Sequence, residues 1–254
     1  MLLKVDYIEQ DAIVSVNAYA TQSNPPWGLS RISNGRADSD KYVYDESAGQ
    51  GTCTYVIDTG IDDTHVVGPR TFPRHGEDEQ TSIWHDLLTH GTGRISKVEP
   101  CKLHLSSRTS GMTSTAMKTQ LFGIKVLADD GFGQWSSIIA GMDHVAKDAQ
   151  YRSCPAGVLV NLSIGGPFSQ AVNNAAADLV NRGFFVAVAA GNDNADASEY
   201  SPASEASVCT VGGTASDDTR YTMSNWGRMV DVMAPAVDVV SLWPGGRTRF
   251  TERR

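Results

Sequence analysis

The chain has 254 residues, of which 41% are hydrophobic and 20% are charged, and its formal net charge is −8. This balance is typical of a globular protein, and the acidic charge argues against binding to a nucleic-acid backbone. Without an apolar run of about 18 residues, no membrane-spanning helix is expected, and the first residues lack the apolar core of a secretory signal.

The first 50 residues show little regular patterning. Residues 1–17 alternate polar and apolar side chains, which predicts one edge strand followed by a boundary. Residues 18–50 are rich in Ser, Asn, Gly, Pro and Asp, and two successive prolines precede Trp27. Because proline removes a backbone donor and fixes φ, we expect irregular surface coil here, anchored by Trp27.

A short buried strand is expected over residues 52–57, where aromatic and β-branched residues form a continuous apolar run. Asp58 ends this strand, and Thr59-Gly60 turns the chain away. Asp is a common turn residue. However, an acid at the carboxyl end of a buried parallel strand also lies where open α/β sheets place their sites.

The next segment, 61–116, is polar and irregular. Its first part, residues 61–92, contains four histidines whose spacings of ten, ten and five fit no metal-ligand pattern, namely His65, His75, His85 and His90. His90 can open a helix, whereas residues 94–116 show neither a helical nor a strand period.

From residue 119 onward, strands and helices alternate. The expected strands span 121–127, 158–164, 184–190, 208–211, 230–233 and 237–242. The expected helices span 136–150, capped by Ser136 or Ser137, and 169–182, closed by Gly183. This alternation predicts right-handed βαβ units and a parallel sheet. The sequon at Asn161 falls inside a core strand, so glycosylation is not expected there.

Polar groups follow three of the expected strands, at Asp58, at 163–166 and at Asn192, and His90 lies between the first two. The order Asp, then His, is that of subtilisin. Several blocks resemble the subtilisin-like serine proteases, in particular the fungal proteinase K-like branch. These blocks are Asp58-Thr59-Gly60-Ile61, His90-Gly91-Thr92, the segments 161–166 and 189–195, Tyr200-Ser201-Pro202-Ala203-Ser204 and Ser224-Asn225-Trp226-Gly227. The resemblance covers about residues 5–245, with a gap at 93–115.

The resemblance implies a three-layer α/β subtilisin-like fold with a mostly parallel sheet, its C-terminal part missing, and serine endopeptidase activity. His90 would be the base that takes the proton from a seryl hydroxyl, and Asp58 would orient its imidazole. Asn192 would donate a hydrogen bond to the oxyanion. Backbone edges of Ser163-Ile164-Gly165 and Gly131-Phe132-Gly133 would bind an extended peptide of apolar-leaning sequence.

The four cysteines could form two disulfides, one disulfide with two free thiols, or none. The resemblance implies a disulfide between Cys53 and Cys154, pairs Cys209 with a cysteine further downstream, and gives Cys101 no counterpart. It also implies a structural calcium site that consists of Asp231 and the carbonyls of Ala206 and Val208. No cofactor is expected for the chemistry itself.

The resemblance also suggests the organisation and partners of the protein. Residues 1–17 look like the tail of an inhibitory propeptide, and residues 18–254 look like a truncated peptidase domain. We expect a secreted monomer that acts on polypeptides and is inhibited by its own propeptide, with no nucleic-acid or membrane partner.

The chain departs from the family at two places. None of its serines lies in a Gly-Thr-Ser-Met-Ala-Thr-Pro block, where the family carries its nucleophile, and Ser224 and Ser241 are expected to be structural. Residues 93–115 are aberrant, being longer than the family's segment and lacking its apolar helical pattern. We hypothesise that this segment and the tail after 246 derive from an intron or a frame error, which sequencing the transcript tests. We therefore expect this chain to hydrolyse nothing.

Two alternatives remain open. A pseudoprotease would bind extended peptides through Ser163-Ile164-Gly165 without turnover. An unrelated doubly wound enzyme that binds a nucleotide would need a Gly-rich turn between a strand and a helix, and Gly131-Phe132-Gly133 lacks the third glycine of that motif.

Overall fold

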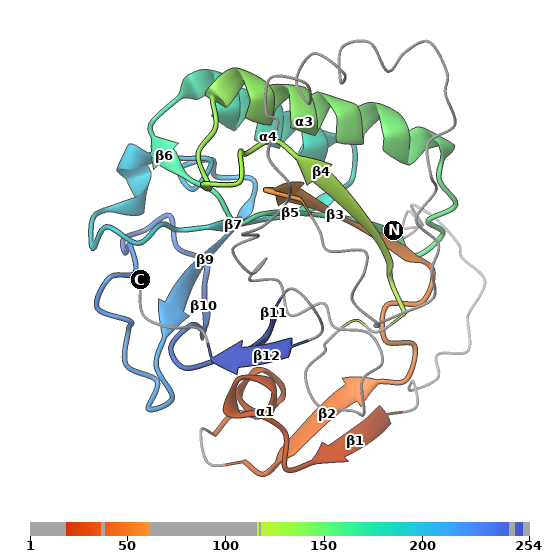
Figure 1. Ribbon diagram of the computed structural model, residues 1–254, viewed down its shortest axis with the longest axis vertical. Helices are drawn as coiled ribbons and strands as arrows, with labels where there is room; N and C mark the ends of the chain where they lie inside the picture. The colour runs from red at the N-terminus through yellow and green to blue at the C-terminus, as the bar shows by residue number, and fades with distance from the viewer. Residues whose placement is uncertain (1–18, 37–38, 61–115, 117, 244–246, 251–254) are drawn as a thin grey trace, which may run out of the picture.

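A computed structural model describes residues 19–36, 39–60, 116, 118–243 and 247–250 (Figure 1). At its centre lies a six-stranded sheet with the order β10-β9-β7-β5-β3-β4, in which every neighbouring pair is parallel. Its strands are β3 (Thr52–Asp58), β4 (Gln120–Lys125), β5 (Gly157–Leu162), β7 (Phe185–Ala189), β9 (Cys209–Thr214) and β10 (Val232–Pro235). This arrangement confirms the predicted α/β class and the parallel sheet.

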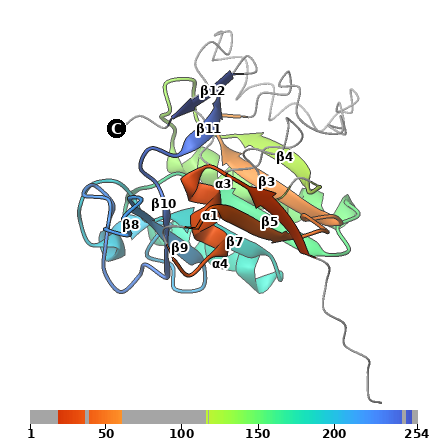
Figure 2. The same ribbon diagram turned by 90° about the horizontal axis from the view of Figure 1, so that it is seen from below.

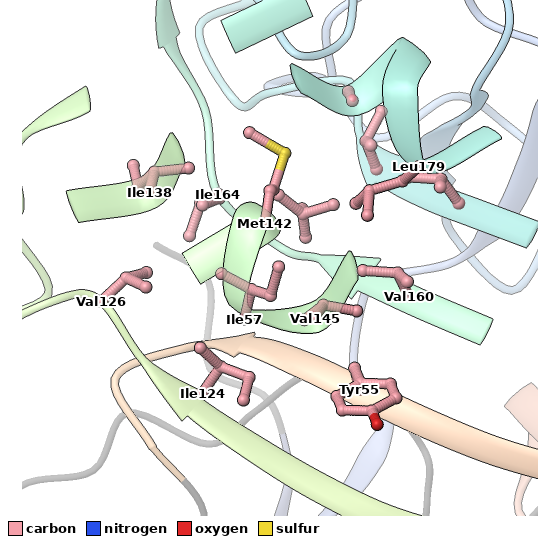
Figure 3. Packing of buried hydrophobic residues seen from close by; sticks show 14 of the residues in the cluster. Tyr55, Ile57, Ile124, Val126, Ile138, Met142, Val145, Val160, Ile164 and Leu179 are labelled. Atoms are coloured by element: carbon pink, nitrogen blue, oxygen red, sulfur yellow. The ribbon is translucent and has the colours of Figure 1, made fainter. Parts of the chain in front are cut away.

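Two helices, α3 (Trp135–Asp148) and α4 (Gln170–Asn181), lie side by side over one face of the sheet (Figure 1). A short 3-10 helix, η2 (Ala149–Tyr151), extends α3. Figure 3 shows side chains of α3 such as Val145 meeting Ile57 of β3 and Val160 of β5, each at most 1% exposed. Burial of side chains of this size stabilises the fold by about 1.5–3 kcal/mol each.

The ends of α4 follow the sequence prediction, whereas the start of α3 does not. The Ser169 hydroxyl caps α4 by accepting from the N–H of Val172, and Gly183, at φ +84°, ends the helical segment. Helix α3 begins at Trp135 with Gln134 as an N-cap that makes no side-chain bond. The predicted cap at Ser136 or Ser137 is therefore wrong, because both residues already lie in the first turn.

The expectation of irregular coil over 18–50 is also wrong. Strands β1 (Tyr19–Ser23) and β2 (Lys41–Asp45) form an antiparallel hairpin, and helix α1 (Trp27–Ser33) lies between them in sequence. Proline is tolerated here because Pro26 is the N-cap, where no intrahelical N–H is needed. Trp27 is an anchor as expected, since its indole donates to the carbonyl of Asp238. The edge strand expected within 1–17 lies outside the described residues.

Smaller elements complete the described part of the chain. They are β6 (Gly166–Pro167), η3 (Ala197–Glu199), β8 (Tyr200–Ser201), β11 (Val240–Trp243) and β12 (Arg247–Phe250). Strand β6 pairs with β8, and β11 pairs with β12. Helix α1 and both N-terminal and C-terminal hairpins lie on the side of the sheet away from α3 and α4 (Figures 1 and 2).

None of the helices in the described ranges has the length and apolar character needed to cross a membrane.

A partly buried polar network joins the end of α3 to the sheet. The hydroxyl of Tyr55 donates to Asp148 at 2.6 Å, and Arg152 donates twice to the same carboxylate, at 2.7 and 2.8 Å. The Arg152 guanidinium also lies 4.9 Å from the centre of the Phe122 ring, which stacks on Tyr55. Burial alone would raise the pKa of Asp148, but the hydrogen bonds from Arg152 and Tyr55 outweigh it and lower that pKa.

This network predicts a defined loss of stability in acid. A carboxyl whose pKa is lowered by folding stabilises the protein above about pH 4 and loses that contribution as the pH falls through the folded pKa. We expect the free energy of unfolding of the unmodified chain to fall more steeply below about pH 4 than that of Asp148→Asn. Urea unfolding at a series of pH values measures this. Asp178→Asn, in the exposed pair with Arg182, is the control and should keep the steep fall.

Candidate functional site

A pocket of about 720 Å³ lies at the carboxyl ends of β3, β4 and β5. One wall is formed by residues 131–133, which follow β4, and the other by residues 163–167, which follow β5. Asp58 and Thr59 line it from the turn after β3. The remaining lining residues are Leu127, Gln134, Trp135 and Ile138. The pocket therefore brings Asp58 together with both segments that were expected to bind a peptide.

Asp58 is held through its backbone at the last position of β3. Its carbonyl accepts from the N–H groups of Val126 at 2.9 Å and Leu127 at 3.3 Å, and its carboxylate accepts from the N–H of Thr59 at 2.6 Å. Thr59 is 4% exposed, and its hydroxyl has no hydrogen-bond partner among the described residues. These main-chain hydrogen bonds thus fix the position of Asp58 at the end of β3.

The wall at 131–133 presents mainly backbone. A turn holds it, since Ala128 donates to the carbonyl of Phe132 and Phe132 donates to the carboxylate of Asp130. The Phe132 side chain is 77% exposed. A Cβ on Gly133 would lie 2.7 Å from Cδ2 of Leu127 and 2.8 Å from a backbone oxygen, so this position requires glycine. The main chain at Gly133 therefore packs directly against Val126 and Leu127.

An aromatic side chain packs against the opposite wall. Ile164 is 8% exposed, and the Ser163 hydroxyl accepts from the amide of Asn161 at 3.1 Å. A Cβ on Gly166 would lie 2.8 Å from Trp135, so the indole contacts the wall directly. Sequence reasoning missed Trp135 and Ile138 as site residues; the signal was that both begin the helix directly after the 131–133 turn.

The lack of space at Gly133 gives a stability prediction. Gly133→Ala should lower the free energy of unfolding by about 1–3 kcal/mol, because the backbone oxygen of Val126 cannot move aside without cost. Urea unfolding is the measurement. Gly165→Ala is the matched control, since the nearest atom to its Cβ would be 3.8 Å away. Equal losses for the two variants would contradict the prediction.

The loop after β7 carries Asn192, whose side chain is exposed and does not line the pocket. Asn225, fully buried, holds this loop: its amide donates to the carbonyl of Ala190, and its side-chain oxygen accepts from the N–H groups of Asp193 and Ala195. Because β7 neighbours β5, Asn192 lies at the same sheet edge as the pocket. The segment 224–227, one of the blocks that resemble the family, therefore supports the Asn192 loop through Asn225.

The position of His90 lies outside the described residues, as does the aberrant segment 93–115. Ser224 is 1% exposed, accepts from the N–H of Gly213 and donates to the carbonyl of Asn225. It is structural, as expected.

Comparison with known proteins adds an independent finding. The sequence profile described as "Subtilase family" matches residues 49–251. The chain belongs to the subtilase family.

Curated relatives of this subtilase include proteinase R of Parengyodontium album, 50% identical over 96% of this chain, and the cuticle-degrading protease of Metarhizium anisopliae, 48% identical over 96%. The chain spans 60% of the length of each. Proteinase T of Parengyodontium album is 47% identical, and the chain spans 80% of it. A crystal structure of a cold-adapted subtilisin-like serine proteinase is 30% identical, with a TM-score of 0.70 over 90% of this chain and 78% of the other.

The subtilase chain contains the disulfide that the resemblance implied. Cys53, at the start of β3, bonds to Cys154, which follows η2, across a separation of 101 residues. Cys209 is a free thiol whose pKa is raised by burial and by the nearby Asp231. Cys101 lies outside the described residues.

Of the residues implied for calcium, Asp231 is hydrogen-bonded to the first part of β9. Asp231 accepts from the N–H of Thr210 at 2.8 Å and donates its own N–H to the carbonyl of Thr210. This places the exposed carboxylate beside the segment that contains Val208. A carboxylate with main-chain carbonyls is an oxygen donor set that suits Ca²⁺. Within the described ranges, no group of three or more His, Cys, Asp or Glu side chains is arranged to hold a metal ion.

Proposed function

We propose that residues 18–254 form the peptide-binding part of a subtilisin-like serine endopeptidase. The observation that carries this proposal is the pocket in which Asp58 meets two backbone walls, at 131–133 and 163–165. An extended peptide would add as a strand between these walls, with main-chain hydrogen bonds on both sides. Apolar surface from Leu127 and Ile138 favours apolar side chains in the peptide.

Each polar group has a role in peptide-bond hydrolysis by this family. Asp58 would hold the imidazole of His90 in the tautomer that accepts a proton from a seryl hydroxyl. Asn192 would donate its side-chain N–H to the oxyanion as the carbonyl becomes tetrahedral. The firm support of its loop by Asn225 suits such a donor, because an oxyanion hole must be preorganised.

We infer that residues 1–254 by themselves bind peptide but do not cleave it, because none of their serines lies in the family's nucleophile block. The test is isothermal titration calorimetry of the 254-residue chain with a peptide amide, together with a casein hydrolysis assay. We expect heat of binding and no hydrolysis, which is also what a pseudoprotease would give. Hydrolysis that disappears in Asp58→Ala would contradict inactivity. Absence of binding would contradict the pocket's assignment.

We also propose a cellular compartment and partners for the protein. Disulfides persist in oxidising compartments, so the Cys53–Cys154 bond favours a secreted protein. Polypeptides are the proposed substrates, the protein's own propeptide is a proposed inhibitor, and the protein is proposed to be a monomer. No cofactor is needed for the chemistry.

We propose a structural calcium ion held by Asp231 and the carbonyls of Ala206 and Val208. A ligand at about 100 times its dissociation constant stabilises the folded state by about 2.7 kcal/mol, so calcium should raise Tm by several degrees. Thermal unfolding with CaCl₂ or with EGTA measures the shift. Asp231→Asn should abolish it, whereas Asp178→Asn, an exposed site distant in sequence, should preserve it. The same Tm with CaCl₂ and with EGTA in the unmodified chain would rule out the site.

A further inference from the structure

Lys125, the last residue of β4, makes three hydrogen bonds with one ammonium group. Its Nζ donates to the carbonyl of Thr59 at 2.9 Å, to the carbonyl of Leu127 at 2.9 Å and to the carboxylate of Asp129 at 2.8 Å. An ammonium has three protons, so all three are used. The side chains of Lys125 and Asp129 are 30% and 31% exposed, so this is a half-buried group, unlike a surface ion pair.

The three acceptors belong to separate parts of the pocket. Thr59 follows Asp58 in the turn after β3, and Leu127 follows β4; both residues line the pocket. Asp129 belongs to the turn that carries the wall at 131–133, in which Gly131 donates to the carbonyl of Ala128 and Ala128 donates to the carbonyl of Phe132. One side chain therefore joins the Asp58 turn to the peptide-binding wall.

We propose that Lys125 is a positioning residue, which sets the wall at 131–133 relative to Asp58; this inference rests on the proposed peptide-binding function. Lys125 lies opposite Asp58 in the β3–β4 register but does not line the pocket. It therefore acts through the main chain and not by touching the peptide.

The geometry calls for lysine in particular. A compact ammonium directs three donors along diverging directions, whereas the planar fork of arginine matches two parallel acceptors. The chain also offers a matched control, because Lys147 and Asp143 form another Lys–Asp pair four residues apart, with side chains 70% and 58% exposed on α3. That pair joins no loops.

The first test is amide hydrogen exchange of the 254-residue chain by NMR. In Lys125→Met, which keeps the apolar stem, the amides of Ala128 and Gly131 should exchange at least tenfold faster, while those of β5 and β7 should be unchanged. Lys147→Met should leave all of these rates unchanged. Unchanged exchange at Ala128 and Gly131 in Lys125→Met would overturn the proposal. If that variant does not fold, the same exchange measurement on Asp129→Ala, which removes one acceptor, tests the proposal by the same criterion.

The second test compares the binding of two peptides that differ in length. Calorimetry with acetyl-Ala-Ala-Ala-Phe-amide, which in the proposed binding mode would extend along the 131–133 wall, should show at least tenfold weaker binding to Lys125→Met. Acetyl-Ala-Phe-amide should weaken less than twofold. Equal weakening of both peptides would indicate a merely structural role and would overturn the positioning claim. If the unmodified chain binds neither peptide, the proposed function fails, and the exchange rates still decide the role of Lys125.

Discussion

Replacing Cys53 and Cys154 together by serine is expected to lower the free energy of unfolding by about 4–5 kcal/mol. The bond closes a loop of 101 residues, and the loss of chain entropy in the unfolded state grows with the logarithm of loop length. Cys53 is fully buried at the start of β3, so the bond also ties the segment after α3 to the sheet. For a domain of this size the loss corresponds to a fall in Tm of roughly 10–20 °C.

Urea unfolding of the oxidised chain and of the double variant measures this difference. Cys209→Ser is the control, since Cys209 forms no disulfide in the described part of the chain, and it should change stability by less than about 1 kcal/mol. A double variant as stable as the control would show that the unfolded chain is already compact across this loop.

The second large loss of stability is expected when Asn225 is replaced. Asn225→Ala should lower the free energy of unfolding by about 3–5 kcal/mol, because the carbonyl of Ala190 and the N–H groups of Asp193 and Ala195 all lose their partner. Each buried polar group left unsatisfied costs about 1–3 kcal/mol. The amides of Asp193 and Ala195 should also lose their protection from hydrogen exchange.

The matched control for this variant is Asn174→Ala. Asn174 is exposed on α4 and accepts one bond, from Gln170. Its loss should cost at most about 0.5 kcal/mol. If Asn225→Ala unfolds at the same urea concentration as this control, the loop after β7 does not depend on the Asn225 side chain.

The sequence predicted the elements whose signals are local. The apolar run before Asp58, the Ser169 cap and Gly183 gave β3 and both ends of α4, because burial and capping leave a mark within a few residues. The 18–50 segment was misjudged because two prolines suggested a break, although Pro26 stands just outside α1.

The pocket could be predicted only in part. One rule, that the carboxyl ends of parallel strands meet at one edge, predicts that Asp58 and the two glycine-containing segments lie together. Trp135, Lys125 and Asn225 could not be found in this way. Their roles depend on contacts with chain segments 31, 66 or about 30 residues away, which no periodicity records.

The contact between Trp135 and Gly166 has a practical consequence. The indole is part of the pocket's lining and touches its wall, whereas the indoles of Trp27 and Trp226 donate to carbonyls in other parts of the fold. A peptide bound as proposed would change the polarity around Trp135, and not around the two other indoles whose side chains the structure describes. The protein thus carries its own optical reporter of occupancy, and intrinsic emission can follow binding without any attached label.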